Sequence, residues 1–108
     1  MKNTYAQTSV RCIVFHEKGM WYGVALEFNV VVDGDSPAVA MDLLNQAVGD
    51  YYAVAKKKKL DVRVLNQTAD PEYAAMWSLV ESSTHAKKTT RRIPSNVYGS
   101  MVLRPAFA

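Results

Sequence analysis

The chain has 108 residues, of which 49% are hydrophobic and 21% are charged. This length fits one domain, because single domains cluster at roughly 100–150 residues, and the hydrophobic share excludes a chain that is disordered throughout. No apolar run reaches the ~18 residues that a membrane helix needs, so we expect no membrane partner. The first residues lack the apolar run of a signal peptide, and the single cysteine has no partner for a disulfide. We therefore expect a cytoplasmic protein.

The net charge of +3 is divided unevenly along the chain. Residues 1–54 carry three bases and six acids, whereas residues 55–108 carry ten bases and four acids. After Glu81 there is no acid at all, only five bases. The chain therefore has an acidic half and a basic half, and a contact with an acidic or phosphate-bearing partner belongs to the second half.

Three strands are predicted before the first helix. Residues 9–17 and Met20–Phe28 alternate β-branched, aromatic and smaller side chains, which is typical of strands, and Asn29–Asp33 continues as a third. The turn at Gly19 is short, so the first two strands are predicted to form an antiparallel hairpin. Gly23 leaves space on one face of the second strand, where we expect a helix to pack.

Two helices are predicted in the remainder of the chain. Ser36-Pro37 is a strong helix start, and apolar residues repeat every four positions behind it, which predicts a helix from Pro37 to about Lys56. Leu60–Leu65 alternates and is predicted to form a short fourth strand. Asp70-Pro71 repeats the helix-start signal, and a second, shorter helix is expected to pack through Tyr73, Met76, Trp77 and Val80.

The predicted fold class is α+β, a two-layer βββαβα arrangement with an antiparallel sheet and the helices packed on one face. We expect residues 1–81 to form this domain. Residues 82–108 are expected to form a basic C-terminal arm, because residues 82–96 are polar and lack periodicity. Val97–Leu103 is a candidate tail strand within the arm.

One segment carries a more specific pattern. Residues Trp21–Ala40, WYGVALEFNVVVDGDSPAVA, combine a tryptophan-led strand ending in Leu-Glu, a strand ending in Gly-Asp-Ser, and an amphipathic helix. This pattern resembles the core of HicB-like antitoxins, over roughly Val10–Ala55 with weaker support over Leu60–Trp77. The resemblance implies a partial RNase H-like fold, a four-stranded sheet with the main helix on one face. It also implies a partner, a small RNA-cleaving HicA-type toxin whose active site the antitoxin covers.

The chain departs from the family pattern in two places. The family commonly begins its helix with acidic residues, as in Leu-Glu-Glu-Ala, whereas this chain has Pro37–Ala40 there. Many complete family members continue into a DNA-binding module, but only Arg104–Ala108 follows the candidate tail strand. We therefore expect an antitoxin core without the usual C-terminal DNA-binding module.

The sequence offers little for catalysis, so we expect no enzyme, no metal and no cofactor. His16, His85 and Cys12 are isolated from one another and lack the spacing of a metal site or a catalytic group. Asp33 and Asp35 precede a helix start, where a structural role accounts for them. No glycine-rich phosphate loop is present in the sequence.

The basic residues divide into two groups. Lys56–Lys59 fall at the expected end of the first helix, where cations complement the helix dipole, and we prefer that explanation to nucleic-acid binding. No helix end accounts for Lys87, Lys88, Arg91 and Arg92, which suit either phosphates or the acidic face of a partner. The alternative function is therefore a stand-alone nucleic-acid-binding regulator that uses the basic arm.

One apolar group raises the question of oligomerisation. On the outer face of the predicted sheet the apolar residues are Ile13, Phe15, Tyr22 and Leu26. Such a face is too apolar to stay exposed in a monomer. We therefore expect a homodimer or a higher homo-oligomer, formed through this face or through paired edge strands.

Overall fold

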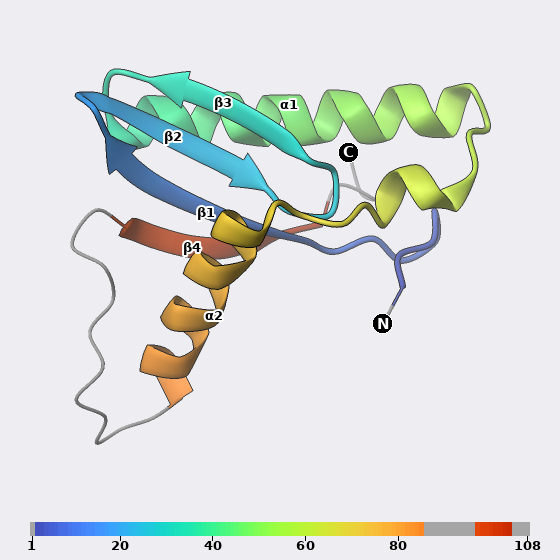
Figure 1. Cartoon of the computed structure of the whole chain (residues 1–108). Coiled ribbons are helices and arrows are strands. Elements are labelled where there is room, and N and C mark those ends of the chain that lie inside the picture. The colour runs from blue at the N-terminus through green and yellow to red at the C-terminus, as the bar shows by residue number, and fades with distance from the viewer. Residues whose placement is uncertain (1, 86–96, 105–108) are drawn as a thin grey trace.

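The computed structural model describes residues 2–85 and 97–104, which form a four-stranded antiparallel sheet with two α-helices packed on it (Figure 1). In chain order the elements are β1 (Val10–Glu17), β2 (Met20–Ala25), β3 (Val30–Gly34), α1 (Pro37–Lys57), the 3-10 helix η1 (Val62–Leu65), α2 (Pro71–His85) and β4 (Val97–Leu103). The strands lie in the order β3-β2-β1-β4. The predicted α+β class is therefore confirmed. Neither described α-helix has the length and hydrophobicity needed to cross a membrane.

The hairpin of β1 and β2 forms as predicted. Its register ends with Glu17 opposite Met20. The two residues between them, Lys18 and Gly19, have φ angles of 52° and 82°, the left-handed conformation that two-residue hairpin turns require. Strand β2 ends at Ala25, earlier than predicted, because Asn29 adopts a φ of 55° and donates its N–H to the Leu26 carbonyl at 3.3 Å.

Helix α1 begins where the sequence predicts and covers one face of the sheet. The Ser36 hydroxyl accepts the Val39 N–H at 3.2 Å, with Pro37 as the first helical residue. The helix packs mainly on β2 and β3. A Cβ at Gly23 would lie 3.1 Å from Leu44, so the space expected above β2 is filled by α1.

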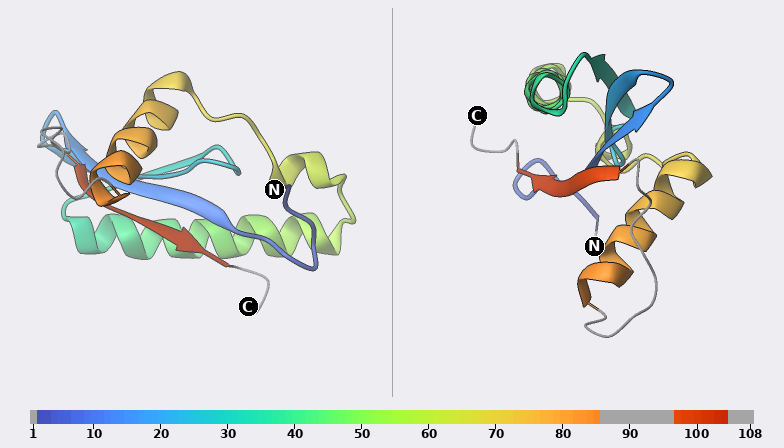
Figure 2. Two further views of the ribbon diagram at one scale, coloured as in Figure 1. Left: turned by 90° about the horizontal axis from the view of Figure 1, so that it is seen from below. Right: turned by 90° about the vertical axis from the view of Figure 1, so that its left-hand side faces the viewer.

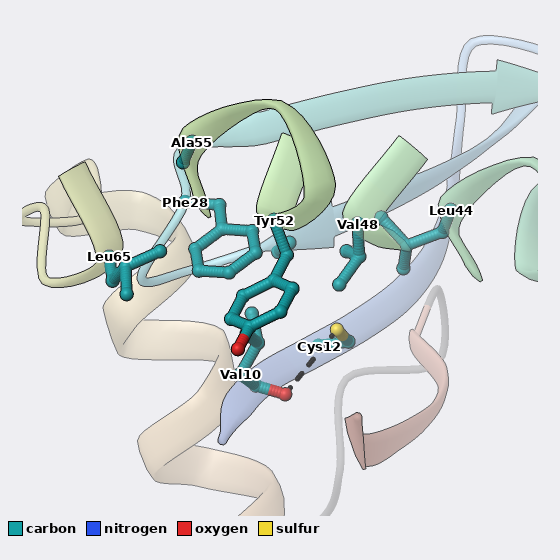
Figure 3. Packing of buried hydrophobic residues seen from close by; sticks show 9 residues of the cluster. Val10, Cys12, Phe28, Leu44, Val48, Tyr52, Ala55 and Leu65 are labelled. Atoms are coloured by element: carbon teal, nitrogen blue, oxygen red, sulfur yellow. Dashed lines mark hydrogen bonds between the residues drawn. The ribbon is translucent and has the colours of Figure 1, made fainter. Parts of the chain in front are cut away.

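The main core lies between α1 and this face of the sheet (Figure 3). Its residues are at most 4% exposed: Val10, Cys12, Ala25, Phe28, Leu44, Val48, Tyr52, Ala55 and Leu65. Val10 and Cys12 of β1 contribute to it, as expected for side chains that alternate across a strand.

The fourth strand predicted over Leu60–Leu65 is wrong, because Val62–Leu65 forms the 3-10 helix η1. The Asp61 carboxylate accepts the Arg63 N–H at 2.9 Å, a local bond that favours a turn over an extended strand. The Asn3 side chain also donates to the Leu65 carbonyl at 2.8 Å. The sheet position beside β1 is taken instead by β4, which pairs along β1 from Val10 to Phe15.

Helix α2 packs over the other face of the sheet, where we expected no helix. Ile13 and Phe15 point to this face and cluster with Val24 and Leu26. The side chains of α2 that pack against the cluster are Tyr73, Met76 and Trp77. The right-hand view of Figure 2 shows α1 and α2 on opposite sides of the strands. Helix α2 continues to His85, past the expected domain end at Glu81. The candidate tail strand, Val97–Leu103, is β4 and belongs to the same sheet.

Candidate protein-binding surface

The sheet has an open edge at β3. Within residues 2–85 and 97–104, only β2 pairs with this strand. An edge strand presents unpaired N–H and C=O groups to which another extended chain can bond. The edge also bears an exposed apolar side chain, because Val31 is 47% exposed. Strand β3 therefore offers a backbone template together with an apolar contact.

An apolar groove of about 380 Å³ lies beside this edge. It separates β3 from the second half of α1 and is lined by Val30, Ala47, Asp50, Tyr51, Val54, Ala55 and Leu60. Val54 and Leu60 are 50% and 42% exposed, and Asp50 is the charged residue of the lining. The groove can hold one or two apolar side chains of a partner. A basic group of the same partner could then pair with the Asp50 carboxylate.

The groove continues along α1 as an exposed apolar flank. Val39 and Leu43 are 46% and 39% exposed, and they precede Ala47 and Val54 at intervals of roughly one or two helical turns. Together with the β3 edge and the groove, we call this region the β3–α1 surface. Apolar patches of this kind with a polar rim are typical of protein-binding sites.

Tyr51 forms a fixed wall of the groove. Its ring stacks on Phe28 with a centroid distance of 4.5 Å. Its hydroxyl donates to the Val64 carbonyl at 2.6 Å and accepts a hydrogen bond from Gln67 Nε2 at 2.6 Å. Burial raises the pKa of Tyr51, against the lowering effect of the Gln67 hydrogen bond, so the phenol stays neutral and can donate. The wall is thus held in place before any partner binds.

Charged groups mark the two ends of the β3–α1 surface. Asp33 and Asp35 are exposed where β3 leads into α1, and Asp50 lies in the groove. Lys56–Lys59 are exposed at the other end, where α1 finishes, as expected for cations near a helix C-terminus. A partner that places basic groups against Asp35 and Asp50 therefore has complementary charge at the first end and the middle.

The predicted partner residues have two different outcomes. Ile13, Phe15 and Leu26 are at most 2% exposed, and Tyr22 is half-buried with its ring 5.5 Å from that of Phe15. These four residues do not form an exposed face, because α2 covers them, and they are not available as an interface between copies of the chain. The basic candidates Lys87, Lys88, Arg91 and Arg92 lie outside the described residues.

The β3–α1 surface was not predicted from the sequence, although a signal for it was present. The apolar repeat of α1 includes both members of pairs such as Val39 and Ala40 or Leu43 and Leu44. Ala40 and Leu44 are buried, whereas Val39 and Leu43 are exposed. An apolar stripe wider than the buried arc of a helix indicates a second contact on its flank.

Of the possible catalytic groups, His16 and Cys12 have different surroundings, and the side chain of His85 lies outside the described part of the structure. His16 is exposed, and its ring lies 4.7 Å from that of Trp21. Cys12 is buried in the core, where burial, with a smaller effect from Glu27, raises the pKa of its thiol to about 12. Such a thiol is protonated at neutral pH and unsuited to nucleophilic attack. Among the described residues, no three His, Cys, Asp or Glu side chains lie close enough to hold a metal ion.

Glu27 has a structural role. Its carboxylate accepts the backbone N–H of Arg11 at 2.7 Å and pairs with the Arg11 guanidinium at 2.6 Å. The Arg11 guanidinium carbon lies 5.6 Å from the centre of the Trp77 ring. Through Arg11, Glu27 therefore links the turn after β2 to β1 and α2.

In comparisons with known proteins, no protein-family model, no curated protein and no solved structure matches the chain.

Proposed function

We propose that this protein is a non-enzymatic antitoxin of the HicB-like type, which binds a small basic RNA-cleaving HicA-type toxin in the cytoplasm and covers its active site. The observation that carries the proposal is the β3–α1 surface, an open strand edge beside a preformed apolar groove. Such a surface suits the capture of an extended protein segment and offers no arrangement for chemistry of its own.

Three further observations support this function. The Trp21–Ala40 pattern that resembles HicB-like antitoxins spans β2, β3 and the start of α1, which are the elements that frame one end of the surface. The fold also has a four-stranded sheet with its main helix on one face, the arrangement that the resemblance implies. At the first end and in the middle of the surface, Asp35 and Asp50 offer complementary contacts for basic groups of a toxin, whereas Lys56–Lys59 at its other end suit an acidic group.

Co-expression with a small basic toxin of the HicA type, encoded beside this chain, tests the proposal. We expect the tagged toxin to retain the chain through purification. We also expect RNA cleavage by the purified toxin to stop as the chain approaches one copy per toxin. Cleavage that continues at its full rate with the chain in large excess would show that the protein is not the antitoxin of that toxin.

A second candidate function rests on the sequence of the basic arm. Lys87, Lys88, Arg91 and Arg92 lie in a segment without acids, and such segments bind phosphates. This function predicts binding to a DNA or RNA duplex that weakens steeply as salt rises and is lost when all four residues are changed to Ala. Binding that is absent at low salt would exclude it.

A further inference from the structure

The two edges of the sheet differ in their charge. Strand β3 contains Asp33 and is followed at once by Asp35. Strand β4 is the opposite edge of the sheet formed by residues 2–85 and 97–104; its sequence, VYGSMVL, has no charged residue and no proline, and the exposed Arg104 follows it. Proteins usually protect an edge strand with charge, proline or a bulge, because an unprotected edge pairs with other chains. The register of β4 with β1 shifts between Val14 and Phe15, near the first residues of β4, so Gly99–Leu103 remains a regular, uncharged edge.

The outward side chains of β4 are also suited to contact. Tyr98 is 60% exposed and Val102 is 41% exposed, with the exposed Ser100 between them at the centre of the strand. A strand that pairs antiparallel with its own copy does so about a two-fold axis, so its central residue faces itself. Ser100 is small and uncharged, and it meets its own copy without steric or electrostatic penalty.

We propose that β4 pairs with β4 of a second copy of this chain, so that the two sheets join into one continuous sheet across the two-fold axis. The charge of the edges selects this arrangement. Pairing of β3 with its own copy about a two-fold axis would centre on Val32 and place the Asp33 carboxylate opposite the apolar Val31 of the other copy, and a charge on an edge strand disfavours such pairing. Pairing through β4 opposes only uncharged side chains.

This dimer goes beyond the proposed function and does not rest on it. Because β3 and β4 lie at opposite edges of the sheet, pairing through β4 leaves both β3 edges free. Each dimer therefore presents two β3–α1 surfaces. If the antitoxin proposal is also correct, one dimer binds two toxin molecules.

Mass measurement by light scattering at micromolar to millimolar concentration tests the dimer directly. We expect the wild-type protein to have a mass of twice the 12.0 kDa of one chain. Ser100→Lys and Ser100→Glu each place two like charges at the two-fold axis, so each variant alone is expected to be monomeric. An equimolar mixture places opposite charges there and is expected to restore the dimer. Val31→Lys, on the other edge, is the matched control and is expected to leave the dimer intact.

Several outcomes would overturn the proposal. A wild-type mass of one chain at every concentration would exclude the dimer. Ser100→Lys and Ser100→Glu variants that remain dimeric would place the interface elsewhere, as would loss of the dimer in Val31→Lys. Circular dichroism confirms that each variant is folded, and retained toxin binding by Ser100→Lys would separate dimerisation from the antitoxin function.

Discussion

Gly34 lies at the end of β3, where the chain turns into α1. A Cβ placed on it would lie 2.8 Å from a Val39 methyl carbon and 3.1 Å from the Ala40 backbone nitrogen. Since the second of these atoms belongs to the helix backbone, the clash cannot be relieved by rotating a side chain. Glycine at this position therefore allows the start of α1 to lie directly against the end of β3, which sets one end of the β3–α1 surface.

Gly34→Ala is expected to lower the free energy of unfolding by about 1–3 kcal/mol, the usual cost of overpacking. Gly99→Ala is the matched control, because a Cβ at Gly99 meets nothing within 4 Å. In that variant the free energy of unfolding is expected to stay unchanged or to rise by up to about 1 kcal/mol, since alanine loses less conformational entropy than glycine on folding. Urea denaturation of both variants measures the difference, and equal stabilities would contradict this account of Gly34.

Burial of the Cys12 thiol makes stability depend on alkaline pH. The pKa of the thiol is raised from 9.0 to about 12 in the folded chain. Above pH 9 the unfolded chain therefore releases a proton that the folded chain retains, so stability is complete below that pH and falls as pH rises toward 12. The slope approaches about 1.4 kcal/mol per pH unit. Relative to Cys12→Ala, the wild type is expected to lose stability between pH 9.5 and 11, and parallel pH profiles of the two would exclude the effect.

At the scale of elements, the end of helix α1 is closed by a lysine with a positive φ, a conformation that usually belongs to glycine. The Lys59 N–H donates to the Lys56 carbonyl at 3.1 Å, and the Leu60 N–H donates to the Ala55 carbonyl at 3.0 Å. This is the Schellman motif, which places Lys59 at a φ of 53°. The motif brings Leu60 beside Ala55, and both residues line the groove.

Lys59→Gly is expected to raise the free energy of unfolding by about 1 kcal/mol, because glycine adopts a positive φ without the steric cost of a side chain. The same substitution two residues earlier, Lys57→Gly, lies within the helix and is expected to lower it by about 1 kcal/mol. Thermal and urea denaturation of the pair measure the two effects. Changes of the same sign would contradict the assignment of the helix end.

The elements with strong local signals could be predicted from the sequence. The Ser36-Pro37 start of α1, the turn at Gly19 and the strand over Val97–Leu103 all form where expected. The alternation of Leu60–Leu65 was misleading, because the Asp61 cap and the hydrogen bonds of Asn3 and Tyr51 to this segment are not visible in its periodicity. Contacts with distant parts of the chain therefore favour the 3-10 helix over a strand in that segment.

The candidate surface could be predicted only in part. The face bearing Ile13 and Phe15 was apolar as expected, but its cover is α2 of the same chain, and sequence periodicity does not tell which face of a sheet a helix chooses. The β3–α1 surface depends on which strands lie at the sheet edges. The strand order depends on the pairing of β4 with β1, and these two strands are far apart in the sequence.

For the whole molecule, the two sheet edges have different chemistry and therefore different partners. The β3 edge has acidic groups and a groove beside α1, and we assign it to a basic toxin. The β4 edge is uncharged, and we assign it to a second copy of the chain. The charge of Asp33 on the β3 edge disfavours pairing of this edge with its own copy, so the two assignments do not compete.

The central claim, toxin binding by the β3–α1 surface, is tested most directly by calorimetric titration of the chain with the HicA-type toxin. Asp50→Lys reverses a charge in the groove, and we expect it to weaken binding about tenfold or more, which corresponds to about 1.4 kcal/mol. Glu72→Lys makes the same charge change at an exposed position of α2 and is expected to leave the affinity within about twofold. Equal affinities of the two variants, or no binding by the wild type, would contradict the account.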